Sequence, residues 1–409
     1  MTRHRARGTL RQRAALASPT AAMFSKVALE REAGQRLRRL SDATRDRFGQ
    51  WRRPTRERMR ALTVDTRGRV QWRDAPAPPL PGPDGAIVHP IAVATCDLDR
   101  MLLLGRTPFP LPLHFGHECV AEVLSVGEHV VQVRPGDHVV VPFQISCGTC
   151  APCRAGHTGN CATVPPVSMF GFGVGGGHWG GAVSDQLAVP YADAMLVPLP
   201  SGVDPAAAAS VADNVSDGYR HIAPYTNLLE EGDGEILILA GMSRRQAFSA
   251  SVPLYAGLVA RALGARQVHF FDSREHVRWH AERLGLVAHT PSEIRHMPTL
   301  PLVVDATASP SGIRTALEHT APDGVCSSLG MLHRIAPIPA GLMFGRNVTL
   351  HVGRSHARAL IPHVLELVGS GRLHPELVTT DLAPLDDAPR AITEHMRGDA
   401  TKTILVEGA

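Results

Sequence analysis

The feature that most constrains this chain is a run of cysteines in one short loop. Cys147, Cys150, Cys153 and Cys161 lie in CGTCAPCRAGHTGNC, so four of the seven cysteines fall within fifteen residues. Four thiolates at this spacing, on a loop punctuated by Gly and Pro, suit the tetrahedral shell of a closed structural zinc site. The sequence therefore predicts a small lobe that is stabilised by zinc.

Three other interpretations of the cysteine run remain open at this point. An iron–sulfur cluster also takes four cysteines, although nothing else in the chain suggests electron transfer. A pair of disulfides would need an oxidising compartment, and the sequence has no apolar signal segment. Coincidental spacing is the third interpretation. We favour structural zinc over all three.

Length and charge narrow the class of protein further. At 409 residues the chain should hold two domains, and an apolar content of 44% is ample for two cores. No stretch approaches the length of a membrane span. Residues 1–58 carry sixteen Lys/Arg against five Asp/Glu, so the rest of the chain is mildly acidic. We therefore expect neither nucleic acid nor a membrane as a partner.

The basic segment 1–58 is compatible with an organelle-targeting peptide, a nucleic-acid-binding tail or an upstream start codon. We expect a dispensable, poorly ordered extension, because the body of the protein opens at Met59. The pair Arg38-Arg39 has no apolar segment after it, which argues against secretion. Cysteines assigned to zinc also favour a reducing compartment, so the expected location is the cytoplasm.

The body shows two different patterns. Its first part has short β-rich runs separated by Gly, Pro and Asp, which predict an irregular antiparallel barrel, at 87–94, 119–126 and 137–142. Its second part alternates apolar runs with helical patterns, which predicts a doubly wound parallel sheet. That alternation covers strands at 235–240, 267–272 and 302–308 and a helix at 252–263. The fold class is α/β.

The chain leaves the parallel sheet near Gly353. A helix at 357–369 and a strand at 402–406 are then expected to return to the barrel. The barrel domain is therefore discontinuous, and comprises 59–215 and 354–409. The expected nucleotide-binding domain, of the Rossmann type, spans 216–353 between these two parts.

Several motifs in this order resemble one family. GHE at 116–118, ATCDLD around Cys96 and the cysteine loop are accompanied by MRALTV from Met59 and by TKTILV at 401–406. Together they resemble the zinc-dependent medium-chain alcohol dehydrogenases, over roughly residues 59 to 409. The resemblance implies a GroES-like barrel that carries a catalytic zinc, beside a Rossmann domain.

A catalytic zinc takes about three protein ligands and keeps one position open. The resemblance implies Cys96, His117 and Asp213 as ligands, the last of these in ADNVSDGY six residues before Tyr219. It also implies Glu118 as a further ligand, bound directly or through water. Asp99 is expected to hold the His117 ring and fix its tautomer.

The chain departs from the family pattern at the proton relay. Where the family usually has a Ser or Thr hydroxyl two residues after the cysteine ligand, this chain has Leu98, which cannot accept a proton. Asp97, Asp217 or a chain of waters are the alternatives. The missing hydroxyl weakens the expectation of an ordinary alcohol oxidation, but it does not affect the expectation of a zinc site.

The nucleotide site departs from its pattern as well. Gly241 follows the first strand of the parallel sheet, but GMSRRQAFSASVP replaces the expected G-x-G-x-x-G. Asp272 ends the next strand, where an acid binds an adenosine ribose and favours NAD over NADP. In the altered loop, Arg244 or Arg245 is expected to contact the diphosphate.

The sequence thus predicts a zinc-dependent oxidoreductase that transfers hydride between an alcohol and NAD, with two zinc ions per chain. The alternatives are a biosynthetic carbonyl reductase of the same family and a zinc-bound relic that acts as a binding protein. A homodimer or homotetramer is expected.

Overall fold

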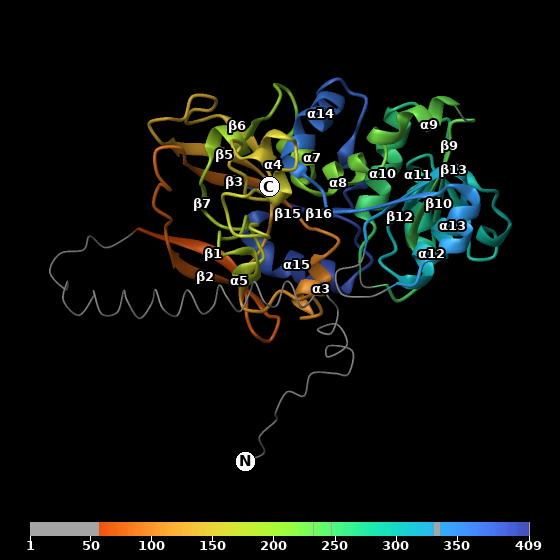
Figure 1. Cartoon of the computed structure of the whole chain (residues 1–409). Helices are drawn as coiled ribbons and strands as arrows, with labels where there is room; N and C mark the ends of the chain where they lie inside the picture. The colour runs from red at the N-terminus through yellow and green to blue at the C-terminus, as the bar shows by residue number, and fades with distance from the viewer. Residues whose placement is uncertain (1–56, 232, 247, 331–335, 409) are drawn as a thin grey trace, which may run out of the picture.

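The computed structural model describes residues 57–231, 233–246, 248–330 and 336–408. Within these ranges the chain forms two lobes side by side (Figure 1). The first is built on mostly antiparallel strands and the second on a parallel sheet covered by helices. These two architectures confirm the expected α/β class. The predicted extension at 1–58 lies, apart from its last two residues, outside the described residues.

The first lobe is an irregular antiparallel barrel. Its larger sheet has the strand order β15-β16-β3-β5-β6-β8, with β7 paired to β3, and its smaller sheet has the order β2-β1-β4. The strands are β1 (Arg58–Val64), β2 (Val70–Pro76), β3 (Ala86–Ala94), β4 (Leu113–His114), β5 (Glu118–Val126), β6 (His138–Val141), β7 (Leu187–Val189), β8 (Val197–Pro198), β15 (Asp381–Pro384) and β16 (Thr403–Val406). Val, Ile and Ala dominate the central strands, and their buried side chains form part of this lobe's core.

Short helices connect the barrel strands, and two longer ones belong to the returning C-terminal segment. They are α3 (Asp99–Leu103), α4 (Ala151–Arg154), α5 (Gly173–Gly176), α6 (Ala192–Met195), α7 (Pro205–Ala208), α8 (Asn214–Arg220), α14 (Ala357–Gly369) and α15 (Ala388–Arg397). The short 3₁₀ turns within the described residues are Thr158–Asn160, Ala209–Ala212, Ala223–Tyr225, Ile294–His296, Pro375–Val378 and Leu385–Asp387.

The second lobe is a doubly wound parallel sheet. Its strands are β9 (Glu235–Gly241), β10 (Gln267–Asp272), β11 (Val287–His289), β12 (Leu300–Asp305), β13 (Thr320–Ser328) and β14 (Thr349–Val352). Their order is β11-β10-β9-β12-β13-β14, so the chain order reverses between β9 and β12. In sheets of this type, ligands bind at the carboxyl ends of the strands beside that reversal.

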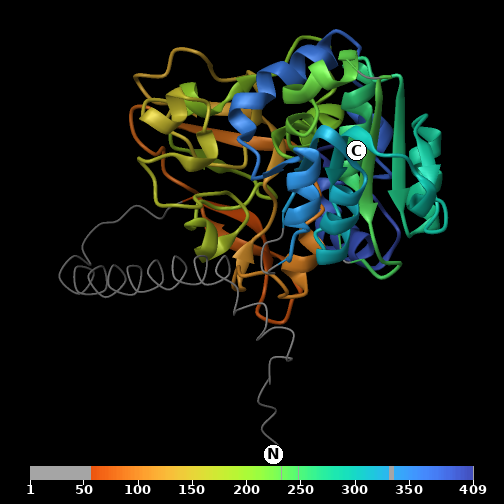
Figure 2. The same ribbon diagram turned by 45° about the vertical axis from the view of Figure 1, so that its right-hand side comes forward.

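Helices cover both faces of this sheet (Figure 2). They are α9 (Thr226–Glu231), α10 (Ser251–Ala262), α11 (Glu275–Arg283), α12 (Pro310–Glu318) and α13 (Ala340–Arg346). Ile236 and Ile238 of β9 join the core cluster that contains α10 and α11, whereas Leu237 and Leu239 join the cluster that contains α12. Both faces of β9 are therefore buried, which explains why its sequence is a continuous apolar run without alternation.

The C-terminal segment returns to the barrel, because β16 pairs antiparallel with β3. The helix expected at 357–369 is α14, and the strand expected at 402–406 is β16, so both elements are confirmed. The boundaries 59–215, 216–353 and 354–409 stay predictions. No helix in the described ranges is long and apolar enough to cross a membrane.

Candidate metal centre and nucleotide pocket

Three adjacent strands bring the residues of the metal centre together. Ala94, the last residue of β3, pairs with Glu118 at the start of β5 and with Ile404 near the start of β16. The segment that follows β3 therefore lies beside the segments that precede β5 and β16. This register places Cys96 next to His117, although the two are far apart in the sequence.

The centre consists of Cys96, His117, Glu118 and Asp213, whose ligand atoms all lie within 4.8 Å of one another. Oδ2 of Asp213 lies 3.5 Å from Nε2 of His117 and 3.6 Å from Sγ of Cys96. Among the described residues, Nε2 of His117 and Oε1 of Glu118 are buried without a hydrogen-bond partner. Buried polar atoms normally have partners, so these sulfur, nitrogen and oxygen donors fit a zinc ion.

The glycine before His117 is required by the local backbone. Gly116 has φ +92°, in the left-handed region that favours glycine. A Cβ at this position would lie 2.8 Å from Cγ2 of Val183 and 2.9 Å from the Val183 backbone nitrogen. The tight approach of Val183 therefore explains why GHE begins with glycine.

Asp213 occupies the N-cap position of α8, which raises the question of whether it is only a helix cap. Its side chain makes no capping hydrogen bond to the helix. The carboxylate instead accepts a hydrogen bond from Nδ2 of Asn214 at 3.1 Å and faces Cys96 and His117. Its placement is that of a metal ligand.

Negative charge accumulates in this buried centre. Burial, followed by the carboxylates of Asp213 and Glu118, raises the pKa of the Cys96 thiol well above its usual range. Burial also raises the pKa of Asp99 to about 6. A bound divalent cation favours the deprotonated forms of such ligands. The electrostatics of the pocket therefore favour a metal ion.

Lys402 provides a positive charge inside this centre. It is fully buried, and its Nζ donates hydrogen bonds to Glu118 at 2.9 Å, to Oδ1 of Asn214 at 2.9 Å and to the carbonyl of Thr95. Burial lowers the pKa of Lys402, but Glu118 together with Tyr255, Cys96 and Asp97 outweighs burial and raises the pKa above its usual range. One oxygen of Glu118 is thus held by Lys402, and the other belongs to the metal centre.

Two of the expected assisting residues have other partners. Oδ2 of Asp99 accepts a hydrogen bond from the backbone N–H of Cys96 at 2.8 Å, while its Oδ1 is buried without a partner among the described residues, so its role toward the His117 ring stays a prediction. Asp217 lies on α8 outside the metal centre, where its carboxylate is bound by Arg220. Burial, opposed by Arg220, raises the pKa of Asp217. The structure therefore does not place Asp217 as a proton acceptor.

Aromatic rings surround the imidazole of the centre. The ring centroid of Phe172 lies 4.9 Å from that of His117, and the centroid of Phe143 lies 5.9 Å from it. Phe109 extends this wall, with its ring 4.7 Å from that of Phe172. The surroundings of the metal centre are therefore largely apolar on this side.

The cysteine loop brings its four sulfurs together. Cys147, Cys150, Cys153 and Cys161 are all free thiols whose sulfurs lie within 4.8 Å of one another. The disulfide interpretation is therefore wrong. Burial raises the pKa of Cys147, but hydrogen bonds led by that of Thr163 outweigh it and lower the pKa to about 5. Four sulfurs on a compact loop fit a structural zinc.

The expected nucleotide residues meet at the end of the parallel sheet, although Asp272 is already engaged. A Cβ on Gly241 would lie 2.6 Å from Oδ2 of Asp272. Asp272 is fully buried, and the guanidinium of Arg274 donates to its two oxygens at 2.9 Å and 2.7 Å. The carboxylate that was expected to bind a ribose is thus paired within the chain.

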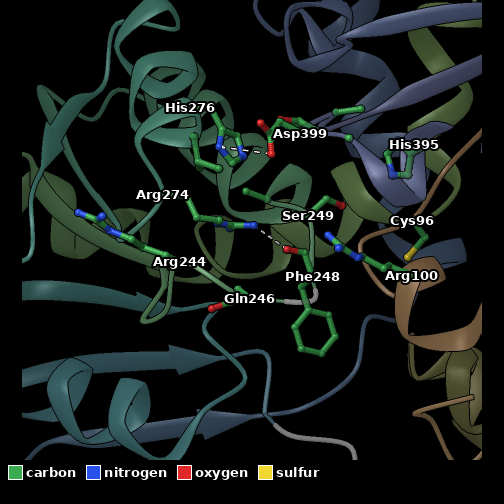
Figure 3. Close-up of a pocket in the computed structure, with 15 residues that line it drawn as sticks. Cys96, Arg100, Arg244, Gln246, Phe248, Ser249, Arg274, His276, His395 and Asp399 are labelled. Carbon is green, nitrogen blue, oxygen red and sulfur yellow. Dashed lines mark hydrogen bonds and ion pairs between the residues drawn. The ribbon is translucent and has the colours of Figure 1, made fainter. Parts of the chain in front are cut away.

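A narrow pocket lies beside these residues, between the two lobes (Figure 3). Its lining includes Cys96, Arg100 and His395 from the first lobe and Arg244, Arg274 and His276 from the second. Arg245 is not part of the lining. Arg244 is, but its guanidinium extends away from Cys96 and Arg100 (Figure 3). Contact of either arginine with a diphosphate stays a prediction.

Sequence reasoning missed three residues of these sites. Lys402 lies in TKTILV, and Asn214 follows Asp213, yet neither position signals a role by itself. Asn214 donates to Sγ of Cys96 at 3.3 Å as well as to Asp213. Arg100 lies one turn after Cys96 and points toward Ser249 in the pocket (Figure 3). Only the pairing of distant strands and the docking of the lobes reveal these contacts.

The fold and the two metal-binding groups define a class of protein. A GroES-like barrel with a Cys-His-Asp centre and a four-cysteine loop, beside a doubly wound sheet, is the architecture of a zinc-type dehydrogenase. Residues 82–201 match the family described as the alcohol dehydrogenase GroES-like domain. This match, the fold and the two metal-binding groups support the zinc-dependent medium-chain alcohol dehydrogenase family and an oxidoreductase activity.

Proteins with similar sequences and structures include alcohol and formaldehyde dehydrogenases, in agreement with this family. The chain is 29% identical to a probable zinc-binding alcohol dehydrogenase of Mycobacterium tuberculosis, over 81% of this chain and 84% of the relative. It is 27% identical to a glutathione-independent formaldehyde dehydrogenase of Pseudomonas aeruginosa, over 83% of this chain and 95% of the relative. The solved alcohol dehydrogenase of Thermus sp. ATN1 superposes with a TM-score of 0.75 at 29% identity, covering 85% of this chain and 99% of that one.

Proposed function

We propose that the protein transfers a hydride between an alcohol, or the corresponding aldehyde or ketone, and NAD, and that this activity depends on zinc. The observation that carries the proposal is the buried group of Cys96, His117 and Asp213, with one oxygen of Glu118 beside it. The relatives named as alcohol and formaldehyde dehydrogenases support the same class of reaction.

Cys96, His117 and Asp213 are the proposed ligands of the catalytic zinc. When bound, zinc supplies Lewis acidity that polarises a substrate oxygen and lowers the pKa of an alcohol. The chain's own residues prepare this position: Asn214 donates to the sulfur and the carboxylate, and Lys402 restrains Glu118. With the four-cysteine loop, the proposed content is about two zinc ions per chain.

NAD is the proposed cofactor, because an acid at the end of β10 favours an unphosphorylated ribose. Arg274 balances the charge of Asp272, so we expect weaker discrimination against NADP than an unpaired acid would give. In the described arrangement the room for a dinucleotide is small, since Arg274 pairs with Asp272 and the pocket beside this pair has a volume of about 70 Å³. Ordinary ligand sites measure roughly 300–1,000 Å³.

The substrate is proposed to be partly apolar. Phe172 and Phe143 face His117, so a carbon chain or ring bound at the metal would contact aromatic surface. Leu98 offers no hydroxyl, and Asp217 is bound by Arg220. A chain of waters is therefore the proposed route for the alcohol proton.

We further propose a homo-oligomer, without a nucleic-acid or membrane partner, that works in the cytoplasm. The four reduced cysteines of the loop, and Cys96 in the metal centre, are best maintained in a reducing compartment.

A panel of alcohols, aldehydes and ketones, each assayed with NAD(H) and NADP(H), tests the proposed function. Turnover is read from the near-ultraviolet absorbance of the reduced nicotinamide. We expect oxidation of an apolar alcohol with NAD, and slower turnover with NADP. Turnover only in the carbonyl-reducing direction would favour the biosynthetic reductase. No turnover by protein that holds both zinc ions would favour the inactive relic.

A further inference from the structure

The N-terminus of α10 is the natural position for the diphosphate of a dinucleotide in this fold. α10 follows β9, the first strand of the parallel sheet, and β9 lies at the reversal of strand order. Free backbone N–H groups and the helix dipole make such a terminus a binding place for an anion. In this protein a side chain from the other lobe already lies there.

The carboxylate of Asp97 binds the N-terminus of α10. Its Oδ1 accepts hydrogen bonds from the Ser249 hydroxyl at 2.6 Å, from the Ser251 backbone N–H at 2.9 Å and from the Ser251 hydroxyl. Its Oδ2 accepts one from the backbone N–H of Val252 at 3.0 Å. Asp97 is buried. These donors are the type that a phosphate would use, and charge-assisted bonds of this kind are strong.

Among the described residues of the second lobe, no side chain caps this helix. The N-cap of α10 is Ala250, which has no side-chain capping bond. The cap therefore comes from the residue that directly follows the proposed zinc ligand Cys96. The loop before α10 is also fixed, because Arg274, which engages Asp272, donates to the carbonyl of Phe248 at 2.7 Å.

We propose that Asp97 is an internal competitor of the cofactor diphosphate. The dinucleotide binds only after Asp97 leaves the N-terminus of α10, which opens the 70 Å³ pocket between the lobes. Arg100, which points into this pocket (Figure 3), then faces the incoming phosphates. Asp97 directly follows Cys96 in the chain. Binding of the cofactor therefore moves the segment that carries this proposed metal ligand. The proposal rests on the proposed use of a dinucleotide.

A purely structural role for Asp97 makes the opposite prediction. A helix cap stabilises the fold, and its loss would leave nucleotide affinity unchanged or reduce it. A competitor lowers the apparent affinity of the cofactor by the fraction of protein in which the site is closed. Removal of a competitor must therefore tighten nucleotide binding even where it lowers the melting temperature.

The test is calorimetry on zinc-loaded full-length protein with NAD and with ADP-ribose, which carries the diphosphate without the nicotinamide. Asp97→Ala vacates the helix N-terminus, and Asp97→Asn keeps the shape but removes the charge. Asp399→Ala is the matched control, since Asp399 lines the same pocket and its described ion pair is with His276 at 3.9 Å. Zinc content and circular dichroism are measured for each variant.

We expect Asp97→Ala to bind both nucleotides at least about ten-fold more tightly than the wild type, as loss of a charge-assisted competitor implies. Asp97→Asn should bind several-fold more tightly, and Asp399→Ala should change little. If Asp97→Ala does not fold, the nucleotide affinity of Asp97→Asn tests the proposal instead. Unchanged or weaker binding in folded, zinc-loaded Asp97 variants overturns the competitor and leaves the proposed function standing. Absence of nucleotide binding in every protein overturns both.

Discussion

At the scale of single residues, the metal centre depends on where each side chain is directed. Asp213 and Asp217 lie on the same short helical segment, one turn apart. Asp213 turns toward Cys96 and His117, whereas Asp217 binds Arg220. Two carboxylates four residues apart thus have different roles because different groups surround them.

This difference gives the first prediction. Asp213→Asn should release or loosen the catalytic zinc, so that the purified protein holds about one zinc per chain instead of two, while its fold survives. Asp217→Asn is the matched control and should keep both ions. Elemental analysis on gel-filtered protein measures the ratio. Two firmly bound zinc ions in Asp213→Asn would remove Asp213 from the ligand set.

The second prediction concerns the buried ion pair of Lys402 and Glu118. Lys402→Met should destabilise the protein by about 3–5 kcal/mol, because it leaves a buried carboxylate without its cation. The double variant Glu118→Gln/Lys402→Met removes that charge and should recover much of the loss. Thermal unfolding of the zinc-loaded proteins measures both effects. An equal or greater loss in the double variant would show that the charge of Glu118 is not what Lys402 stabilises.

Residues next to a recognisable motif could be predicted from the sequence, and residues joined only by the fold could not. Cys96, His117 and the four-cysteine loop were identified because each lies in a short pattern with a chemical meaning. Lys402 and Asn214 contact them through the register of β3, β5 and β16, which no local pattern encodes. Asp272 was placed correctly, but its pairing with Arg274 was not foreseen.

At the scale of elements, the expected strands and helices agree closely with the structure. The helix expected at 252–263 is α10 (Ser251–Ala262), and the strand expected at 235–240 is β9 (Glu235–Gly241). Apolar periodicity carried these predictions. Serine is a common helix cap, but Ser249 and Ser251 both donate to Asp97 of the other lobe. Docking of the two lobes decided this contact.

A third prediction concerns α15, which packs on β16 through His395. The ring is buried, and its Nδ1 lies 2.9 Å from the Thr403 hydroxyl. Burial, followed by the charge of Lys402, lowers the pKa of His395 to about 4. A histidine that stays neutral in the fold contributes stability above its unfolded pKa of about 6.5, and this contribution is lost as pH falls toward 4.

His395→Asn removes this titration and keeps a polar group near Thr403. The stability advantage of the wild type over this variant should shrink by about 2 kcal/mol between about pH 7.5 and pH 5. Denaturation of both proteins at both pH values measures this difference in stability. Protonation of other groups affects the two proteins alike and cancels from the comparison. A constant advantage would contradict the lowered pKa of His395.

At the scale of the whole molecule, one edge of the parallel sheet is open in the described structure. β14 is the terminal strand of that sheet, and Val352 on it is 51% exposed. On the adjacent helix α13, Phe344 is 89% exposed. An exposed edge strand with apolar side chains is a template for pairing with another chain. A second copy of this chain, related by a two-fold axis, is the expected partner.

The fourth prediction follows from this edge. The wild type should sediment as a dimer or a larger even assembly, and Phe344→Asp should shift it toward the monomer. Leu382→Asp is the matched control, since Leu382 is 65% exposed on β15, an edge strand of the barrel. Sedimentation velocity distinguishes the species. A monomeric wild type, or equal effects of both variants, would contradict assembly through β14.

The central claim is that zinc held by Cys96, His117 and Asp213 enables hydride transfer, and a zinc titration tests it most directly. The protein is stripped of its more accessible zinc with a chelator, and turnover with NAD and the best alcohol of the panel is measured as zinc is restored. We predict no turnover at about one zinc per chain, and a linear rise to full activity at about two. Turnover that is already complete at one zinc, or unchanged by the second, would contradict the account.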